Sequence, residues 1–362
     1  PQHHHHRPPC FQRRPLSAAA ALPAVIALLA LLVLTLTSLG FAQPRLEPYD
    51  PPRGDQRIVV FGDFNGPYGS LDYPAPVANV LSAITDFWRP DLLLSPGDVI
   101  AGQSRELPGA RLQQMWRAFD QAVAAKLRAA EVPYAFAMGN HDGSSLAGAG
   151  AAYLFERDRE AAAEYWGQEM YRTNLAYVDR RGFPFDYAFR AGGAFVAVID
   201  ASSASVSGAQ RRWLAATLST PEARAAELRI VVGHLPLVAV GEGRDGPGEV
   251  ITDTQGLIAL FEENSVDLYI SGHHAAYYPG RLGELELLFA GGVGARRLLG
   301  DDGPPRSTVT LIDVWYEPLR LTYSTFDAST LELVAPESLP PELASGVRLS
   351  TRAGPAVADA SR

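Results

Sequence analysis

Four histidines lie beyond the N-terminal segment of this chain, and each belongs to a short motif that could bind a metal ion. They are His141 in Gly-Asn-His-Asp, His234 in Gly-His, and His273 and His274 in Gly-His-His. Upstream of them lie Gly-Asp63-Phe-Asn65 and Gly-Asp98. Imidazole, carboxylate and amide oxygen are the ligands that divalent transition metals take in proteins. A domain that uses all its histidines in this way is predicted to be a metalloenzyme.

Each motif directly follows a short apolar run that is typical of a buried strand. The runs cover residues 58–61, 92–94, 134–138, 230–232 and 268–270. Helices are predicted between the first three runs, at residues 77–88 and 112–130. Alternating strands and helices indicate βαβ units around a central sheet. Because ligands bind at the carboxyl ends of the strands in such sheets, we expect the motifs to meet at one edge.

The remaining patterns complete the expected domain. A strand is predicted at residues 195–200, a helix at 210–218, and closing strands of a second sheet at 287–290, 308–315 and 319–324. Residues 143–185 carry several aromatic side chains and are predicted to form a helical insertion that caps the site. After residue 327 the chain is rich in Pro, Ala, Ser and Glu without periodicity, so residues 328–362 are predicted to be a disordered tail.

The order of the five motifs resembles that of the calcineurin-like metallophosphoesterase superfamily. That family reads Asp-x-His, Gly-Asp, Gly-Asn-His-Asp or -Glu, Gly-His and Gly-His-x-His, and the resemblance here runs from about Ile58 to Asp327. It implies an α/β fold with two mixed β-sheets packed face to face and flanking helices, a four-layer sandwich over residues 57–327. The alternative is five coincidental turns on another α/β fold.

The resemblance also implies a role for each motif residue. Two close divalent ions would generate a hydroxide nucleophile and neutralise the phosphoryl oxygens. Asp98 would bridge the two ions, and Asp63 would bind the first. The second ion would be bound by Asp98, Asn140, His234 and His273. His141 would protonate the leaving oxygen or hydrogen-bond the phosphate, and Asp142 would orient its ring.

Two departures from the family pattern weaken the first metal site. Asn65 and Ala275 stand where the family has histidines that serve the first ion. That site keeps Asp63, the shared Asp98 and at best the amide oxygen of Asn65. His274 lies one residue early, so in an extended loop its side chain is expected to point away.

The predicted cofactors are up to two divalent ions from the set Mn²⁺, Fe²⁺, Zn²⁺ and Mg²⁺, with a firm second site and a weakened first site. Oxygen ligands at the first site suit Mn²⁺ or Mg²⁺ more than Zn²⁺. Purple acid phosphatases also lack the first-motif histidine, but they place a tyrosine three residues after the second-motif aspartate. Ala101 stands at that position here, so no iron–tyrosinate site is expected.

The N-terminal residues have the features of an export segment. Three arginines flank an apolar stretch from Leu16 to Ala42, which ends in small residues of the kind that a signal peptidase reads. Residues 1–42 are therefore predicted to be a signal peptide or an uncleaved N-terminal membrane anchor, followed by a linker at residues 43–56. The expected localisation is periplasmic, extracellular or anchored on the outer face of the cytoplasmic membrane.

Charge limits the class of partner. The formal net charge is −9; the first 42 residues hold three arginines and no acidic residue, which leaves 28 basic and 40 acidic residues and a charge of −12. This balance argues against binding to a nucleic acid backbone. The expected partner is a phosphorylated small molecule or lipid head group, and any membrane attachment would come from the N-terminal segment.

These features predict an exported metal-dependent phosphoric ester hydrolase, in which metal-bound hydroxide attacks a phosphate mono- or diester. An alternative is a degenerate relative with one firm metal site, which binds a phosphorylated ligand with little or no turnover. A third class is an envelope-anchored interaction protein that uses the fold as a scaffold. Turnover of generic phosphoesters with Mn²⁺ would separate the first class from the other two.

Overall fold

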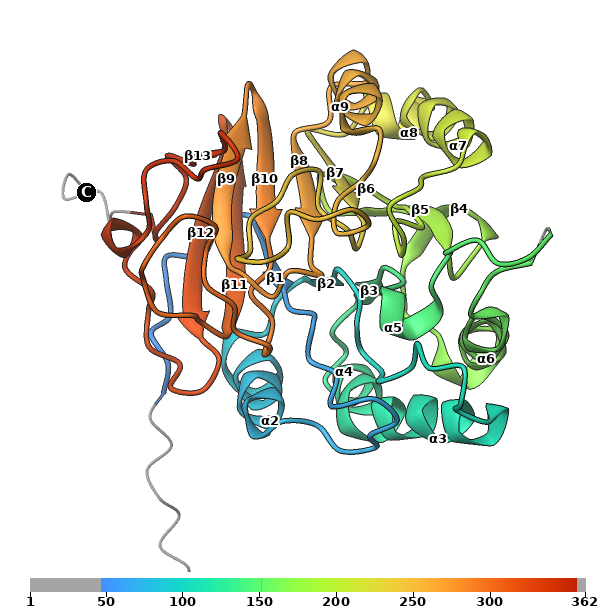
Figure 1. The fold of residues 1–362 in the computed structure, drawn as a ribbon. Coiled ribbons are helices and arrows are strands. Elements are labelled where there is room, and N and C mark those ends of the chain that lie inside the picture. Colours follow the sequence, from blue (N-terminus) through green and yellow to red (C-terminus); the bar gives the residue numbers. More distant parts are fainter. Residues whose placement is uncertain (1–46, 151, 357–362) are drawn as a thin grey trace, which may run out of the picture. The chain divides into compact units, whose positions relative to one another are not determined.

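The computed structural model describes residues 47–150 and 152–356, which belong to one compact unit that begins at Glu47 (Figure 1). This unit contains two mixed β-sheets with helices on their outer faces, as predicted from the motif order. The export segment predicted at residues 1–42 lies outside the described residues. No helix in the described part of the chain is long and apolar enough to cross a membrane.

The first sheet has five strands in the order β12-β11-β1-β2-β3. Their bounds are Gln56–Val60 (β1), Leu92–Ser95 (β2), Tyr134–Phe136 (β3), Thr308–Tyr316 (β11) and Leu319–Asp327 (β12). The strands β1, β2 and β3 are parallel, and β11 pairs with β1 in antiparallel fashion. The parallel part of this sheet therefore delivers the first three motifs to the same edge.

The second sheet has eight strands in the order β13-β9-β10-β8-β7-β6-β5-β4. Their bounds are Ala176–Gly182 (β4), Asp186–Ala191 (β5), Ala194–Val198 (β6), Leu228–Val232 (β7), Leu268–Ser271 (β8), Tyr278–Leu282 (β9), Leu285–Phe289 (β10) and Arg348–Leu349 (β13). The strands β6, β7, β8 and β10 run parallel. The two histidine motifs follow β7 and β8, which are neighbours in this sheet.

Helices cover the outer faces of both sheets (Figure 1). The α-helices are Ala75–Ser82 (α2), Gly109–Phe119 (α3), Ala125–Ala129 (α4), Asn140–Gly143 (α5), Glu156–Trp166 (α6), Gly208–Leu218 (α7), Pro221–Arg224 (α8) and Thr254–Glu263 (α9). Two π-helical segments, Ala83–Trp88 (η2) and Asp120–Ala124 (η3), extend α2 and α3, and short 3₁₀ turns occur at Glu169–Tyr171 (η4) and Pro336–Ser338 (η5).

Strand β1 shows why the apolar runs are continuous instead of alternating. Ile58 and Val60 belong to the core that joins the two sheets. Val59 belongs to the other core, together with residues of α2 and α3. Because successive side chains of a strand point to opposite faces, a strand that is covered on both faces needs an apolar residue at every position. This double burial gives the strands, and the loops that follow them, a rigid base.

Two strands predicted for the second sheet belong to the first. Strands β11 and β12 extend the first sheet beyond β1, whereas residues 285–289 form β10 of the second sheet. Arg57 on β1 and Asp313 on β11 form a buried ion pair, with Arg57 Nε donating to Asp313 Oδ1 over 2.9 Å. The partner of a strand is decided by such contacts between distant residues, which the local pattern does not contain.

The helical part of the segment at residues 143–185 does not cap the site. Its helix α6 packs beside α3, where the rings of Tyr165 and Trp116 stack with centroids 5.0 Å apart. Of the described residues in this segment, Ser144 and Leu146 line the pocket at the motifs. Tyr165 and Trp166, two of the aromatic residues that suggested a cap, instead pack against Trp116 of α3.

The prediction of a disordered tail is wrong for residues 328–356. Strand β13 pairs with β9, and Leu339, Leu343 and Val347 are buried. The Ser350 hydroxyl donates to the buried carboxylate of Glu286 on β10 over 2.6 Å. The apolar anchors lie in irregular backbone, so they show no helical or strand periodicity in the sequence. Residues 357–362 lie outside the described part of the chain.

Candidate metal centre

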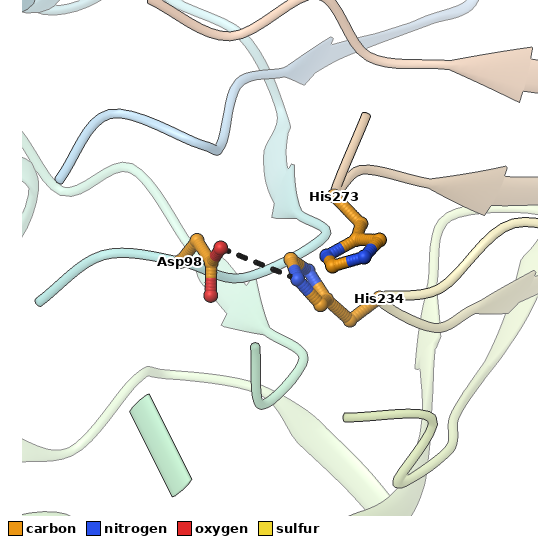
Figure 2. A group of neighbouring side chains, drawn as sticks. All are labelled: Asp98, His234 and His273. Atoms are coloured by element: carbon orange, nitrogen blue, oxygen red, sulfur yellow. Dashed lines mark ion pairs between the residues drawn. The ribbon is translucent and has the colours of Figure 1, made fainter. Parts of the chain in front are cut away.

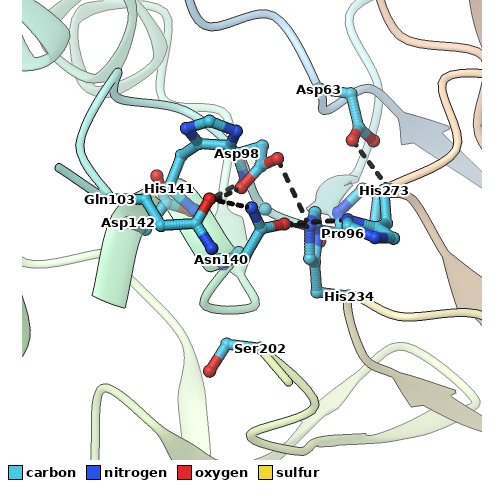
Figure 3. Close-up of polar contacts among 12 residues, drawn as sticks. Asp63, Pro96, Asp98, Gln103, Asn140, His141, Asp142, Ser202, His234 and His273 are labelled. Carbon is cyan, nitrogen blue, oxygen red and sulfur yellow. Dashed lines mark hydrogen bonds and ion pairs between the residues drawn. The ribbon is translucent and has the colours of Figure 1, made fainter. Parts of the chain in front are cut away.

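The five motifs meet at the carboxyl ends of five strands (Figure 3). Asp63, Asp98 and Asn140 follow β1, β2 and β3, and His234 and His273 follow β7 and β8. Asp63, Asp98 and His273 have φ values of 49°, 55° and 67°. Non-glycine residues in this left-handed region cost about 1–3 kcal/mol each, and such strain concentrates at functional sites. The strand ends therefore hold these side chains in conformations that an isolated loop would avoid.

Four predicted ligands of the second ion bring their donor atoms to one point (Figure 3), and Figure 2 shows three of them, Asp98, His234 and His273. Asn140 Oδ1 lies 2.8 Å from His234 Nε2 and 2.8 Å from His273 Nδ1. Asp98 Oδ2 lies 3.3 Å from His234 Nε2. One carboxylate, one amide oxygen and two imidazoles form a mixed oxygen and nitrogen set that suits a divalent transition metal. These residues therefore fit the second metal site that the sequence predicts.

The tautomer of His234 is set by the backbone. Its Nδ1 lies 2.7 Å from the carbonyl oxygen of Pro96, which can only accept a hydrogen bond. Nδ1 therefore carries a proton, and Nε2 faces Asn140 and Asp98. A ligand histidine whose second nitrogen donates to a carbonyl is the usual arrangement at metal sites.

The charges at this point shift several pKa values. Burial lowers the pKa of His234, but the carboxylates of Asp98 and Asp63 outweigh burial and raise it to about 9. Burial raises the pKa of Asp98, but His234 and His141 reverse this and lower it below its ordinary value. Burial and the nearby His234 lower the pKa of His273 to about 3, which keeps this ring neutral. Neutral imidazole and ionised carboxylate are the forms that bind metals, so a bound ion would have to displace the second proton of His234.

Gln103 orients the amide of Asn140 and was not predicted from the sequence. Asn140 Nδ2 donates to Gln103 Oε1 over 2.6 Å, which turns Asn140 Oδ1 toward the two histidines. Gln103 has a φ of 66° and lies in the loop that follows Asp98. Its position five residues after a motif aspartate carries no recognisable signal in the sequence.

Asp142 does not orient His141, in contrast to the prediction. Its carboxylate accepts backbone N–H groups from Asp98, Val99, Ile100 and Gly139 at 2.8–2.9 Å. These bonds join the loop after β2 to the loop after β3. Asp142 is fully buried, and a buried carboxylate needs several donors to remain ionised. Its role is therefore to hold the loop that carries Asp98.

His141 lines the pocket and is positioned by the backbone. Its Nδ1 lies 3.2 Å from the carbonyl oxygen of Gly102, so Nδ1 carries a proton and Nε2 is the nitrogen left for a ligand. The backbone N–H of His141 donates to Asp98 Oδ1 over 2.9 Å. The ring of Tyr68 lies 5.0 Å from the His141 ring. His141 is thus tied through its backbone to Asp98, a predicted ligand.

Two motif glycines let the carboxylates pack against bare backbone. A Cβ atom at Gly139 would lie 2.1 Å from Asp98 Oδ1, and one at Gly272 would lie 2.1 Å from Asp63 Oδ2. Any side chain at these two positions would displace a carboxylate of the site. This close approach explains why the motifs begin with glycine.

The first-ion side of the site is built from oxygen atoms. Asp63 Oδ1 accepts the backbone N–H of His273 over 2.7 Å, whereas its buried Oδ2 has no hydrogen-bond partner among the described residues. Burial and the neighbouring Asp98 raise the pKa of Asp63 to about 8. Asn65 is tied to the site through its backbone, where its N–H donates to the carbonyl oxygen of Asp98 over 3.2 Å. A desolvated carboxylate oxygen without a donor fits a nearby cation.

His274 points away from both ion positions. Its Nδ1 accepts the backbone N–H groups of Val240 and Gly241 at 3.3 and 3.2 Å, and its Nε2 donates to the carbonyl oxygen of Glu249 over 2.9 Å. Glu249, His273 and His274 place potential ligand atoms within 4.8 Å of one another. However, both nitrogens of His274 are occupied by backbone groups, so His274 has no lone pair to offer an ion at this second cluster.

An open pocket of about 320 Å³ lies beside the metal ligands. It is lined by Tyr68, Asp98, Gln103, Asn140, His141, Ser144, Leu146, Ser202, Ser203, Ala204, Leu235, Arg244, Pro247, Gly248, Glu249 and His273. Arg244 contributes a cation to this wall, and Ser203 contributes a hydroxyl. A second cavity, of about 360 Å³ between the end of α6 and β4, contains none of the motif residues.

The fold and this site define a two-sheet α/β protein with a metal-binding centre at the shared edge of its parallel strands. The sequence profile of the calcineurin-like phosphoesterase family matches residues 56–277. The chain therefore belongs to the calcineurin-like phosphoesterase family, which confirms the resemblance read from the motifs. No curated protein sequence matches this chain.

Several solved structures share this fold at low sequence identity. A purple acid phosphatase from yellow lupin (Lupinus luteus) has 15% identity and a TM-score of 0.55, over 80% of this chain and 54% of that one. This chain thus spans about half the length of the lupin protein. A dimetal phosphatase from Danio rerio has 15% identity and a TM-score of 0.51, over 79% of this chain and 98% of that one.

GAP50, the anchor in the inner membrane complex of Plasmodium, has 15% identity and a TM-score of 0.52, over 77% of this chain and 87% of that one. At such identities these similarities show the fold alone. They confirm the predicted architecture of two mixed sheets with flanking helices.

Proposed function

We propose that this chain is an exported, metal-dependent phosphoric ester hydrolase that acts on a phosphate mono- or diester. The observation that carries the proposal is the convergence of Asp98, Asn140, His234 and His273 on one point beside an open pocket. Membership of the calcineurin-like phosphoesterase family supports metal-dependent phosphoester chemistry. The basic and apolar N-terminal segment supports export.

The residues of the site divide the chemical work between them. The four convergent residues would hold the second ion, and Asp63 with Asp98 would hold a first ion through oxygen atoms. When bound, such ions polarise the phosphoryl oxygens and lower the pKa of water. His141 keeps its Nδ1 proton on the Gly102 carbonyl, so its Nε2 can hold a proton for the leaving oxygen.

The pocket favours a substrate with a compact anionic group and a polar remainder. The domain outside the first 42 residues has a formal charge of −12, so attraction of an anion has to be local. Bound cations would supply that attraction, because Arg244 on the pocket wall is already paired with Glu249. Ser144, Ser202 and Ser203 add neutral polar residues to the pocket lining. A phosphorylated small molecule or lipid head group is the partner we propose.

A phosphoester panel tests this function. Protein stripped with a chelator would be assayed on nitrophenyl phosphate and bis(nitrophenyl) phosphate with Mn²⁺, Fe²⁺, Zn²⁺ or Mg²⁺. We expect metal-dependent turnover that Asp98→Asn abolishes, together with loss of bound metal. Asp302→Asn, an exposed change of the same type, serves as the matched control. Absence of turnover with every metal, in protein that binds metal, would refute the catalytic proposal.

A second candidate is a degenerate relative that binds a phosphorylated ligand without turning it over. Asn65 and Ala275 favour it, because they leave the first-ion side without an imidazole. In that case phosphate esters would raise the melting temperature of the metal-loaded protein without being hydrolysed. Hydrolysis of the stabilising ester would exclude this second candidate.

A further inference from the structure

One ring nitrogen of His273 faces the candidate metal site, and the other contacts Glu249. Its Nδ1 lies 2.8 Å from Asn140 Oδ1, at the point where the four ligand atoms meet. Its Nε2 lies 2.9 Å from Glu249 Oε2. Glu249 belongs to none of the five motifs and comes from the loop before α9.

This geometry decides which nitrogen of His273 is free to bind an ion. An ionised carboxylate accepts a hydrogen bond more strongly than the neutral amide oxygen of Asn140, so the contact to Glu249 places the proton of the neutral ring on Nε2. The neutral ring then has its lone pair on Nδ1, which faces the site. Carboxylates commonly fix the tautomer and the ring orientation of metal-binding histidines in this way.

Glu249 is itself held at two points. Arg244 Nη1 donates to Glu249 Oε2 over 2.7 Å, so a cation already balances this carboxylate. The backbone carbonyl of Glu249 accepts from Nε2 of the buried His274 over 2.9 Å. Nδ1 of the same ring accepts from the backbone N–H groups of Val240 and Gly241. His274 therefore ties the start of this loop to its end.

The loop needs this anchor because it has little structure of its own. Residues 241–249 contain four glycines. At Gly243, Gly246 and Gly248 an added Cβ would contact nothing within 4 Å. Glycine-rich backbone without packing contacts has many accessible conformations. The contact of His274 with the Glu249 carbonyl is therefore a direct restraint on the position of this glutamate.

We propose that Glu249 is a positioning residue that fixes the tautomer of His273, and that His274 anchors the loop that presents Glu249. The adjacent histidines of Gly-His-His then have different tasks: His273 binds the second ion, and His274 supports it at a distance. This inference rests on the second metal site of the proposed function. The second histidine of Gly-His-His, which departs from the family's Gly-His-x-His pattern, would then support the second metal site instead of binding the first ion.

Metal binding by variants of the chelator-stripped protein tests the proposal. Zn²⁺ affinity and stoichiometry would be measured by competition titration for wild type, Glu249→Ala, Glu249→Gln and His274→Ala. Glu242→Ala, an exposed change on the same loop, is the matched control. We expect Glu249→Ala to weaken the tightest site by about 10–100-fold. Glu249→Gln should lose less, because its amide oxygen still accepts from Nε2. Unfolding of the metal-free variants would report any general loss of structure.

A spectroscopic readout separates positioning from a merely structural role. In the Co²⁺-loaded protein, the ring N–H protons of ligand histidines give shifted, exchangeable proton resonances. The His273 Nε2–H resonance should exchange slowly in wild type and in Glu242→Ala, and should be lost to solvent exchange in Glu249→Ala. His274→Ala should weaken the same site without lowering the number of bound ions.

Three results would overturn the proposal. The first is an unchanged Zn²⁺ affinity in Glu249→Ala. The second is an unaltered set of exchangeable resonances in that variant. The third is the loss of one bound ion from His274→Ala with the tightest site intact, which would make His274 a ligand. Failure of the wild type to bind any metal would instead refute the proposed function.

Discussion

Asp142 holds Asp98 through the backbone: Asp142 Oδ2 accepts the N–H of Asp98 over 2.8 Å, and the same carboxylate accepts three further amides. The side chain that the motif order assigns to the orientation of His141 therefore joins two strand ends instead. This makes the aspartate of Gly-Asn-His-Asp a structural support of the loop that carries Asp98.

Asp142→Asn should lower the free energy of unfolding of the metal-free protein by about 3 kcal/mol, because an amide nitrogen would replace one oxygen that accepts two N–H groups. Urea denaturation would measure the loss, with the exposed Asp302→Asn as control. The ratio of kcat/KM for alkyl and nitrophenyl phosphates should stay at the wild-type value, because the His141 ring is held by the Gly102 carbonyl and not by Asp142. A change of that ratio without a change in stability would restore the orienting role.

His141→Ala should slow hydrolysis of alkyl phosphates by about 100-fold or more, and that of nitrophenyl phosphates much less. A general acid matters most when the leaving oxygen is strongly basic. Steady-state kinetics on the two ester classes would measure the ratio of the losses. Equal losses for both classes would indicate that His141 positions the phosphate and does not protonate the leaving group.

Gln103→Leu should weaken the second metal site by about tenfold, because Asn140 loses the acceptor that turns its amide oxygen toward the histidines. Gln103→Glu keeps an acceptor at that position and should retain most of the affinity. Competition titration with Zn²⁺ would compare the two variants. If Gln103→Glu loses as much affinity as Gln103→Leu, the hydrogen bond to Asn140 is not what holds the site.

Asp63→Asn should change how the stability of the metal-free protein depends on pH. Burial and the nearby Asp98 raise the folded pKa of Asp63 from 3.8 to about 8. Between these pH values the folded wild type binds more protons at Asp63 than the unfolded chain, so this residue makes stability fall as pH rises. The variant lacks this contribution. As pH rises, its free energy of unfolding should therefore increase relative to that of the wild type, by at most about 1.4 kcal/mol per pH unit.

Denaturation of metal-free wild type and Asp63→Asn between pH 5 and pH 8 would measure that difference. The comparison has to be made between the two proteins, because neutral His273 contributes an opposite dependence in acid. Parallel stability curves would mean that Asp63 does not carry the proton in the folded state.

Ala275→His should create a tighter first metal site, with Zn²⁺ affinity rising by about tenfold or more and Mg²⁺ affinity rising less. Ala275 lies on the loop beyond His273, and the wild-type side chain offers no ligand atom. Calorimetric titration of the metal-free proteins would count the sites. Two tight sites already present in the wild type would mean that other residues complete the first site.

The sequence alone was sufficient to predict which side chains converge at the candidate metal centre, because they belong to short motifs at the ends of strongly apolar strands. Asp98, Asn140, His234 and His273 each follow a run whose burial is evident from composition. Parallel strands with buried faces bring their carboxyl ends to one edge, so the convergence of these side chains follows from local patterns. The two-sheet architecture followed from the resemblance that the same motifs carry.

Tertiary structure decided the features that depend on contacts between distant segments. The placement of β11 beside β1 depends on contacts such as the Arg57–Asp313 ion pair, 256 residues apart in sequence. Gln103 and Glu249 reach the site from irregular loops, where neither periodicity nor a motif marks a functional side chain. The His274 ring hydrogen-bonds to backbone groups of Val240, Gly241 and Glu249. The chain turns at His273, whose φ is 67°, and this turn directs the His274 side chain toward them. Hydrogen bonds of this kind depend on where a loop lies in space, and only the packed structure specifies that position.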